Sequence, residues 1–367
     1  MQVLVFTTWF PDAQAPSTAP FALNHVRAIA AQHDVKVVHI MLGGSGGVVV
    51  EDFEGISVTR IPLSPKRPWS YGVVLGHLRQ ALKQADILHT MAFTSAAVAA
   101  PAALGRRKTW VHTEHWSGVN NPASVSKAWV VMSWLRYLLR LPHAVTAVSE
   151  AQAVGLRRFS RGGAVYVVPN VVTKVGEPAP RAGGNSGRVE VVSVGGLNAG
   201  KRPGLAVEAL HLLRNQGLDA SLTWVGDGPL RGEIEQQIDR LGLGGHVTVT
   251  GMVPPTQVAD HLRRADIFLL PTAHETFCMA AAEGVAMGLP VVITDLPAVR
   301  DFLTSENSLL VSGESAQDFC AGVCAAVDKF STVSAAAISG TLPTRFTPEN
   351  VASQFTQIYD RVRGGAG

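Results

Sequence analysis

Two glutamates eight positions apart, Glu275 and Glu283, are the residues of this chain whose type and spacing best suit chemistry. A carboxylate accepts hydrogen bonds from hydroxyl groups such as those of a sugar. A helix is expected to begin between them, so backbone N–H groups at Phe277, Cys278 and Met279 favour an anion, phosphate above all. An anion cradle beside two hydroxyl acceptors predicts a nucleotide-sugar site. The alternative is a surface glutamate ahead of a helix and a second one on its solvated face.

The elements that must position this pair are predicted from the flanking sequence. The apolar run 265–270 predicts a buried strand, the Ala-rich run after it predicts the helix that carries Glu283, and residues 291–294 predict the next strand. Glu275 then lies on the loop that follows a strand. An open parallel sheet binds its ligand at that edge.

Both halves of the chain alternate strand-like and helix-like segments, which predicts an α/β fold with parallel sheets between helices. The expected strands are 3–6, 35–40, 56–61, 86–90, 109–112, 144–148 and 165–168, then 189–194, 220–225, 246–250, 267–270 and 291–294; the expected helices of the first half are 22–31, 78–84 and 126–140. We therefore predict a Rossmann-like domain over 1–170, a Gly- and Pro-rich linker over 171–188 and a second such domain over 189–345. Residues 346–367 form a terminal helix, because Pro348 follows a capping threonine and an apolar stripe (Val351, Phe355, Ile358, Tyr359, Val362) follows at helical spacing.

Composition places the chain among well-buried globular proteins, with 47% hydrophobic and 16% charged residues in 367. The start of the chain lacks the basic region of a signal peptide, and the apolar stretch 91–104 is too short to span a membrane. Cys320 and Cys324 are expected to pack on one helix face rather than bind metal, and the expected compartment is the reducing cytoplasm. Residues 1–180 carry 17 Lys and Arg against 9 Asp and Glu, so the first half, with net charge +8, is expected to face something anionic.

Several segments together resemble one family, the retaining GT-B glycosyltransferases of family 4, also called group 1. The matching segments are 195–203 (a phosphate-binding glycine loop with a lysine), 226–229 (Gly-Asp-Gly-Pro), 275–283 (two glutamates with seven residues between) and 288–292 (Gly-Leu-Pro-Val-Val), with weaker matches at 147–150 and 168–170. The resemblance covers essentially the whole chain. It implies two Rossmann-like domains that face a central cleft, acceptor-binding first and nucleotide-sugar-binding second, with a C-terminal helix crossing back to the first domain.

The resemblance also implies roles for particular residues. Lys201 is expected to contact the donor diphosphate, Glu275 the hydroxyls of the transferred sugar and Glu283 the ribose. His115 resembles a first-domain histidine that faces the donor sugar, with His112 as its rival, while Glu114 is expected to be only a local hydrogen-bonding partner. Glu275, His115 and Lys201 are thus the predicted catalytic residues. The donor set adds Gly196, Arg202, Phe277, Cys278, Met279, Met252 and Val253, and the acceptor side comprises Phe10, Pro20, Phe21, His112 and Trp116.

Three positions depart from the family pattern. Gly196 stands where the family has an arginine that binds diphosphate, and the neighbouring Arg202 is the candidate to replace its charge. Cys278 stands where glycine is usual. The segment 19–21, Ala-Pro-Phe, replaces a glycine pair and stiffens the first loop.

The implied reaction is transfer of a hexose-type sugar from a nucleoside-diphosphate sugar, UDP or GDP as the nucleotide, with retention and without a metal or other cofactor. Lys201, Arg202 and the helix N-terminus would stabilise the departing diphosphate. The acceptor is a glycan, a lipid-linked sugar or a small molecule, and no pattern indicates nucleic acid. The alternatives are a nucleotide-sugar epimerase of the same fold and a non-catalytic binding protein at a membrane surface.

Residues 126–140 combine aromatic and aliphatic side chains with Lys127, Arg136 and Arg140. A basic amphipathic helix of this kind can lie on an anionic membrane, and basic residues at 66–67 and 106–108 would add to its charge. The favoured interpretation is an ordinary packed helix of a Rossmann-like domain. The alternative is peripheral contact of this segment with the inner face of the cell membrane.

Overall fold

The computed structural model describes residues 1–13, 15, 18–64, 66–104, 108–173 and 187–364. The chain divides into two compact units, Met1–Val171 with Arg345–Gly367 (unit 1) and Val172–Thr344 (unit 2). The predicted linker falls largely on residues 174–186, outside the described part of the chain. Among the described residues no helix combines the length and the apolar character that crossing a membrane would take.

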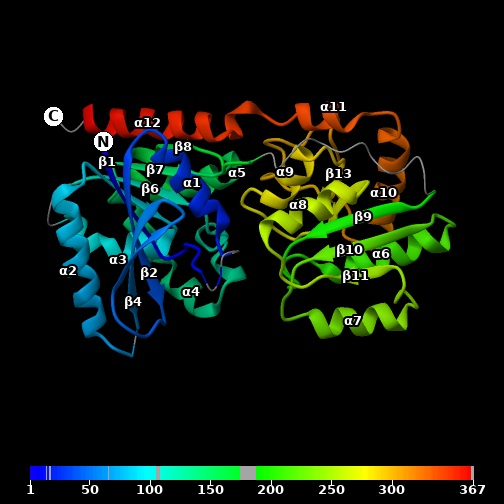
Figure 1. Cartoon of the computed structure of the whole chain (residues 1–367), viewed down its shortest axis with the longest axis horizontal. Helices are drawn as coiled ribbons and strands as arrows, with labels where there is room; N and C mark the ends of the chain where they lie inside the picture. The colour runs from blue at the N-terminus through cyan, green and yellow to red at the C-terminus, as the bar shows by residue number, and fades with distance from the viewer. Residues whose placement is uncertain (14, 16–17, 65, 105–107, 174–186, 365–367) are drawn as a thin grey trace. The chain divides into compact units, whose positions relative to one another are not determined.

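Unit 1 is built on a sheet in the order β3-β4-β2-β1-β5-β6-β7-β8, which is parallel except for the edge strand β3 (Figure 1). The strands are β1 (Gln2–Thr7), β2 (Asp34–Leu42), β3 (Val49–Phe53), β4 (Ile56–Leu63), β5 (Ile87–Met91), β6 (Thr109–Glu114), β7 (Ala144–Ala147) and β8 (Val165–Val167). The central strands are almost wholly buried because helices cover both faces of the sheet. All predicted strands of the first half are present, whereas β3 was not predicted.

The helices of unit 1 divide between the two faces. They are α1 (Pro20–Ala30), α2 (Trp69–Gln84), α3 (Phe93–Leu104), α4 (Lys127–Val131), α5 (Glu150–Leu156) and α12 (Pro348–Gly364), with short 3-10 helices η1 (Ser117–Val119), η2 (Pro122–Ser124), η3 (Met132–Arg140), η4 (Arg157–Phe159) and η5 (Arg161–Gly163). One apolar core lies under α2 and α3, and the other lies under α1 and α12.

The prediction of one long α-helix over 126–140 is wrong, because most of this segment is a 3-10 helix. The segment begins as α4, capped by the Ser126 side chain, and continues from Met132 as the 3-10 helix η3. The side chain of Arg136 donates to the carbonyl oxygen of Ser133 at 2.7 Å. That oxygen would accept the N–H of Tyr137 in an α-helix, so the side chain competes with the α-helical pattern here.

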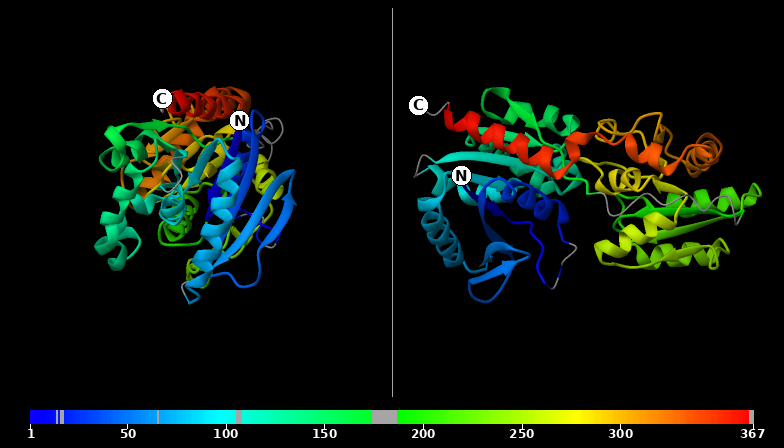
Figure 2. Two further views of the ribbon diagram at one scale, coloured as in Figure 1. Left: turned by 90° about the vertical axis from the view of Figure 1, so that its left-hand side faces the viewer. Right: turned by 45° about the horizontal axis from the view of Figure 1, so that its top comes forward.

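The terminal helix α12 returns to unit 1, as expected. Its predicted stripe is buried in the same core as residues of α1 and the sheet. Thr356 on α12 hydrogen-bonds His33 and Gln32 beyond the end of α1. The views in Figures 1 and 2 agree in drawing α12, in red, along one face of unit 1.

Unit 2 holds a wholly parallel sheet in the order β11-β10-β9-β12-β13-β14. The strands are β9 (Val189–Val194), β10 (Ala220–Val225), β11 (Val247–Val249), β12 (Ile267–Leu270), β13 (Val291–Thr294) and β14 (Ser308–Val311), and the helices are α6 (Pro203–Asn215), α7 (Arg231–Arg240), α8 (Pro255–Arg264), α9 (Met279–Ala286), α10 (Ala316–Phe330) and α11 (Ala335–Gly340). All five predicted strands are present, and β14 extends the sheet by one. This strand order is that of a Rossmann fold, so unit 2 is a doubly wound α/β layer structure.

Candidate functional site

The site of unit 2 lies where its strand order reverses. The chain moves outward from β9 to β10 and β11, then crosses to β12 on the other side of β9. The loops that leave β9 and β12 adjoin at the carboxyl edge of the sheet, where an open α/β sheet binds its ligand in a crevice. Lys201 lies on the loop after β9 and Glu275 on the loop after β12, so the topology brings two predicted residues together from positions 74 apart in sequence.

Backbone contacts hold these two loops against each other. The carbonyl oxygen of Gly200 accepts the N–H of Ala273 at 2.8 Å and the hydroxyl of Thr272 at 3.1 Å. These bonds join the residue before Lys201 to the loop that carries Glu275. The position of the pair is thus fixed by main-chain geometry rather than by the flexible lysine.

Lys201 and Glu275 form an ion pair with 2.5 Å between Nζ and Oε1. Their side chains are 25% and 10% exposed, so the pair is shielded from most solvent. Burial by itself lowers the pKa of Lys201, but the carboxylate of Glu275 raises this pKa above its ordinary value. The ammonium group therefore stays charged, as a group that binds diphosphate must.

Cys278 completes this cluster from the N-terminus of α9. Its thiol hydrogen-bonds the Glu275 carboxylate, and burial, followed by the charge of Glu275, raises the pKa of the thiol far above its usual range. Cys278 is therefore a neutral thiol and not a nucleophile. Its backbone has φ 71°, a left-handed conformation that glycine adopts freely and other residues adopt at a cost. The glycine that is usual at this position would suit this backbone.

Glu283 lies one turn further along α9 and is partly buried. Burial raises the pKa of its carboxyl group from 4.5 to about 7. In the described part of the chain this carboxylate has no hydrogen-bond or ion-pair partner. A carboxylate kept in such surroundings has its acceptor capacity available for a ligand that donates hydrogen bonds.

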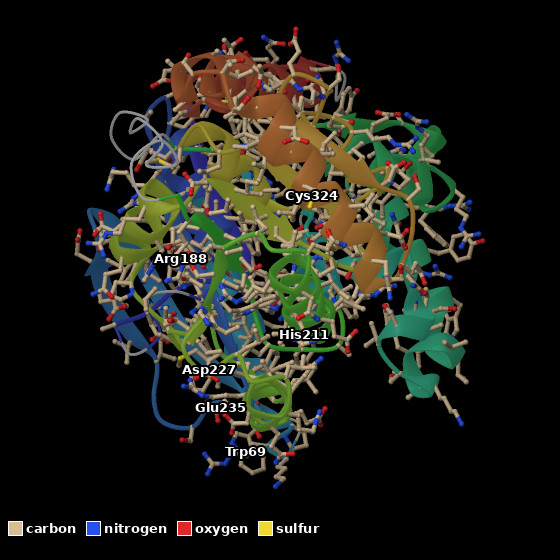
Figure 3. The ribbon with its side chains drawn as sticks, turned by 90° about the vertical axis from the view of Figure 1, so that its right-hand side faces the viewer. Trp69, Arg188, His211, Asp227, Glu235 and Cys324 are labelled. Atoms are coloured by element: carbon tan, nitrogen blue, oxygen red, sulfur yellow. The ribbon has the colours of Figure 1, made fainter. Side chains whose placement is uncertain are left out.

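The glycine loop after β9 packs on the turn after β10. Leu197 donates its N–H to Asp227 O at 3.0 Å, and Leu230 donates to Leu197 O at 3.0 Å. A Cβ atom at Gly226 would clash with the carbonyl oxygen of Gly195, so this close approach requires glycine. The Asp227 carboxylate accepts from Arg231 at 3.0 Å, and Figure 3 labels Asp227 and Glu235 beside α7. The turn thus packs against the glycine loop of the site, and the Asp227 carboxylate is held in an ion pair with Arg231.

The space beside Gly196 is taken by Asn198, a residue that no sequence pattern indicated. A Cβ atom on Gly196 would lie 2.9 Å from the side-chain nitrogen of Asn198, and the Asn198 side-chain oxygen accepts the N–H of Lys201 at 3.2 Å. Arg202, the predicted substitute for the missing arginine, pairs instead with Glu314 at 3.2 Å and lines a hollow of about 450 Å³ between α6 and α7. In this structure Lys201, not Arg202, is the cation beside Glu275.

The remaining donor-set residues of unit 2 fall into two groups. The ring of Phe277 is buried and stacks on Phe302 with 5.3 Å between ring centroids, so any donor contact must come from its backbone. Met279 opens α9, whose first-turn N–H groups have no partner within the helix. Met252 is exposed and Val253 is partly buried, on the segment after the Gly226–Gly251 bridge.

His115 of unit 1 is buried just beyond the end of β6, with its ring against Phe21 at 4.6 Å and against His25 at 5.1 Å. Neither ring nitrogen has a hydrogen-bond partner among the described residues. Burial, then the neighbouring His25 and His89, lowers the pKa of His115 well below its usual value. His115 is therefore a neutral imidazole whose two ring nitrogens are buried without a hydrogen-bond partner among the described residues.

His112 and Glu114 serve local structure, as was expected for Glu114. The Glu114 carboxylate accepts the N–H groups of His115 at 3.0 Å and Trp116 at 2.8 Å, and His112 Nε2 lies 3.2 Å from its other oxygen. Since His112 also bonds Thr90 through Nδ1 at 2.9 Å, both its nitrogens are engaged. Between the two rival histidines, His115 is the one with unengaged nitrogens.

The other acceptor-side candidates differ in exposure. Phe10 is buried in the apolar core of unit 1 beside Phe53, so its side chain does not reach a surface, contrary to the prediction. Pro20 is exposed at the start of α1, after Ala19 in a left-handed conformation with φ 48°. Phe21 and Trp116 are partly buried, and Trp116 packs on Trp129.

Comparison with known proteins adds a family context. A model described as "Glycosyl transferases group 1" matches residues 188–329, and one described as "Glycosyltransferase Family 4" matches residues 18–173. A GDP-mannose-dependent alpha-(1-6)-phosphatidylinositol dimannoside mannosyltransferase of Mycobacterium tuberculosis is 34% identical over 121 residues, which are 33% of this chain and 31% of that protein. A putative teichuronic acid biosynthesis glycosyltransferase, TuaC of Bacillus subtilis, is 28% identical over 66% of this chain and 62% of its own length.

The matched part is 31% of the length of the mycobacterial protein and 62% of the length of TuaC, so this chain spans less than two thirds of each of these curated relatives. Among solved structures, HepE of Anabaena in complex with UDP and glucose has a TM-score of 0.78 at 18% identity, covering 98% of this chain and 100% of that one. At 18% identity, this structural similarity shows only that the two proteins share a fold.

Proposed function

We propose that this chain, which belongs to glycosyltransferase family 4 (the group 1 glycosyl transferases), transfers a hexose-type sugar from a nucleoside-diphosphate sugar to an acceptor. The observation that carries the proposal is the Lys201–Glu275 pair, set beside the α9 N-terminus where the strand order of unit 2 reverses. At one edge of the sheet, the cation and the helix N-terminus can bind a diphosphate, and the two carboxylates can accept hydrogen bonds from sugar hydroxyls.

The donor is assigned residue by residue. Lys201 and the first N–H groups of α9 would bind the diphosphate, Glu275 the hydroxyls of the sugar and Glu283 the ribose. Uridine and guanosine diphosphates are the favoured nucleotides, since HepE is solved with UDP and the mycobacterial relative is named for GDP-mannose. The acceptor class is a glycan, a lipid-linked sugar or a small molecule. The reaction would take place in the cytoplasm, which suits three cysteines that are all free thiols.

We propose retention at the anomeric carbon and no requirement for a metal ion. Positive charge from Lys201 and the helix N-terminus would stabilise the diphosphate as the sugar–oxygen bond breaks. The Glu275 carboxylate is held by Lys201 and the Cys278 thiol, which makes it a poor candidate for a covalent nucleophile. Attack by the acceptor on the face that the diphosphate leaves is the mechanism consistent with these contacts. In unit 1, His115 remains the candidate to contact sugar hydroxyls, as a neutral imidazole.

The first test is a thermal-shift screen in EDTA against UDP, GDP, ADP and dTDP and their common sugar conjugates. A ligand bound by the folded state raises the melting temperature by mass action. We expect one nucleotide to raise it clearly. No shift with any nucleotide would contradict the donor assignment, and accumulation of an epimerised nucleotide sugar without acceptor would favour an epimerase.

The second test replaces Glu275 with glutamine and uses Glu306→Gln as the matched control. Glu306 is exposed in unit 2, between β13 and β14. We expect Glu275→Gln to lower the transfer rate by about 10²-fold or more while nucleotide affinity stays the same or rises, because Lys201 loses its competing partner. The control should keep the wild-type rate. Equal loss of nucleotide binding and transfer in Glu275→Gln would contradict the assigned role.

A further inference from the structure

The segment from residue 125 to residue 140, which we call the α4–η3 segment, exposes apolar side chains that the fold does not cover. Val131 is 77% exposed and Trp134 is 66% exposed. The exposed large apolar residues of this segment are Val125, Val130, Val131, Met132, Trp134 and Tyr137. Exposed apolar residues gathered in one patch mark places of interaction.

This exposure does not come from loose packing, because the opposite face of the segment is firmly anchored. The indole N–H of Trp129 donates to Gly118 O at 2.7 Å, and its ring lies against Phe93. Arg136 donates to Val119 O at 3.0 Å and stacks on the ring of Phe159 at 4.3 Å. Leu139 is fully buried. The segment is held in place with its second apolar face turned outward.

The surroundings of this face are basic. Between residues 115 and 165 the chain has six Lys and Arg and a single acid, Glu150, a net charge of +5. Lys127, Arg140, Arg157, Arg158 and Arg161 are exposed. Glu150 pairs with Arg157, and η4 packs beside η3, where Arg140 donates to Arg158 O at 3.4 Å. Of the residues near 106–108, only Lys108 lies in the described part of the chain.

We propose that the α4–η3 segment docks unit 1 on an anionic lipid bilayer. Aliphatic side chains with Trp and Tyr suit the boundary between headgroups and acyl chains, and the surrounding cations suit acidic headgroups. A second copy of the same face would bring two patches of like charge together, which opposes self-association. Figure 2 (left view) draws the segment in teal at the margin of unit 1.

The test compares two double variants of the full chain. Val131→Ser/Trp134→Ser removes the two most exposed apolar side chains of the segment. The control, Val50→Ser/Trp69→Ser, removes side chains of the same types that are 70% and 69% exposed elsewhere on unit 1, on β3 and at the start of α2. Figure 3 labels Trp69. Melting temperatures and nucleotide binding are measured first, and both variants should match the wild type because the four side chains are exposed.

Binding is measured by co-sedimentation with vesicles of phosphatidylcholine alone and with about 30% phosphatidylglycerol, at low salt and at 0.5 M salt. We expect the wild type and the control to bind the anionic vesicles alike, with weaker binding to neutral vesicles and at high salt. Val131→Ser/Trp134→Ser should lower the partition coefficient by about tenfold. The proposal fails if the wild type does not bind anionic vesicles, if both variants bind equally, or if neutral vesicles bind as well as anionic ones. A dimer that only this variant abolishes, without vesicle binding, would assign the face to a second copy. Because nucleotide binding is read without vesicles, failure here leaves the donor proposal untouched.

Discussion

Glu283 gives the sharpest prediction, because its ionisation sets the affinity for the donor. Burial raises the pKa of this carboxyl group to about 7, and the proposed role needs the carboxylate as acceptor for two ribose hydroxyls. A protonated carboxyl group offers fewer acceptor sites, so it must lose its proton before it can accept hydrogen bonds from both ribose hydroxyls. Lowering the pH through 7 should therefore weaken nucleotide-sugar binding.

The size of the effect follows from the pKa of about 7. The free protein has this group roughly 10% ionised at pH 6 and roughly 90% ionised at pH 8. If only the ionised form binds, the apparent dissociation constant is about tenfold larger at pH 6 than at pH 8. The stability of the free protein depends on pH in the opposite direction: it falls as the pH rises. Because the folded pKa lies above the unfolded value, this group stabilises the fold below about pH 4.5, and the contribution is lost as pH rises toward 7.

The assay is calorimetric titration with a nucleotide sugar at pH 6, 7 and 8, in buffers of different ionisation enthalpy. A nucleotide sugar is preferred to the free diphosphate, whose terminal phosphate itself titrates near pH 6. Binding at pH 7 should release roughly half a proton, which the buffers report. Glu283→Gln should bind weakly and with the same affinity at all three pH values. Wild-type affinity that does not change between pH 6 and pH 8 would refute the reasoning.

Three further predictions concern the rest of the molecule. Lys201→Met should lower the transfer rate by about 10²–10³-fold, measured by product formation at saturating donor, and a loss under threefold would mean that another cation holds the diphosphate. Tyr359→Phe removes a hydroxyl 2.7 Å from Nδ1 of buried His89 and should destabilise unit 1 by about 1–3 kcal/mol in urea unfolding; an unchanged midpoint would show that water replaces the bond. Gly288→Ala, at φ 83°, places a methyl group 2.6 Å from a side-chain carbon of α11 and should cost unit 2 more than about 1–2 kcal/mol, whereas Gly244→Ala, with open space around it, should be neutral.

Hydrophobic periodicity predicted those parts of the fold whose apolar pattern fits only one type of secondary structure. The stripe of α12 and the apolar strand runs have a period that only one element satisfies, and each is present. Helix α3 was not predicted because it is apolar on all sides and contains Pro101. Strand β3 was not predicted because a charged pair, Glu51 and Asp52, interrupts its apolar residues; it pairs only at the sheet edge, where partly exposed strands tolerate charge.

The site was predictable in its composition but not in its contacts. Spacing indicated that Glu275 would follow a strand, and the family resemblance supplied Lys201 as a partner for the donor. The direct contact between them depends on which loops adjoin at the crevice, which no local pattern encodes. The same limit explains Arg202, whose sequence position suggested a role that its ion pair with Glu314 does not support. It also explains Phe10, since an aromatic residue in a loop gives no sign of being buried.

The return of α12 to unit 1 has a consequence for how the protein is made. Unit 2 is one continuous stretch, whereas unit 1 lacks its segment from Arg345 onward until the ribosome has passed α12. Through most of synthesis, the core under α1 that Val351, Phe355 and Tyr359 later fill stays open to water. Unit 1 is therefore begun before unit 2 and completed after it. In the nascent chain unit 1 is the part most in need of chaperone protection, and a premature stop before α12 harms the fold of the unit that holds β1.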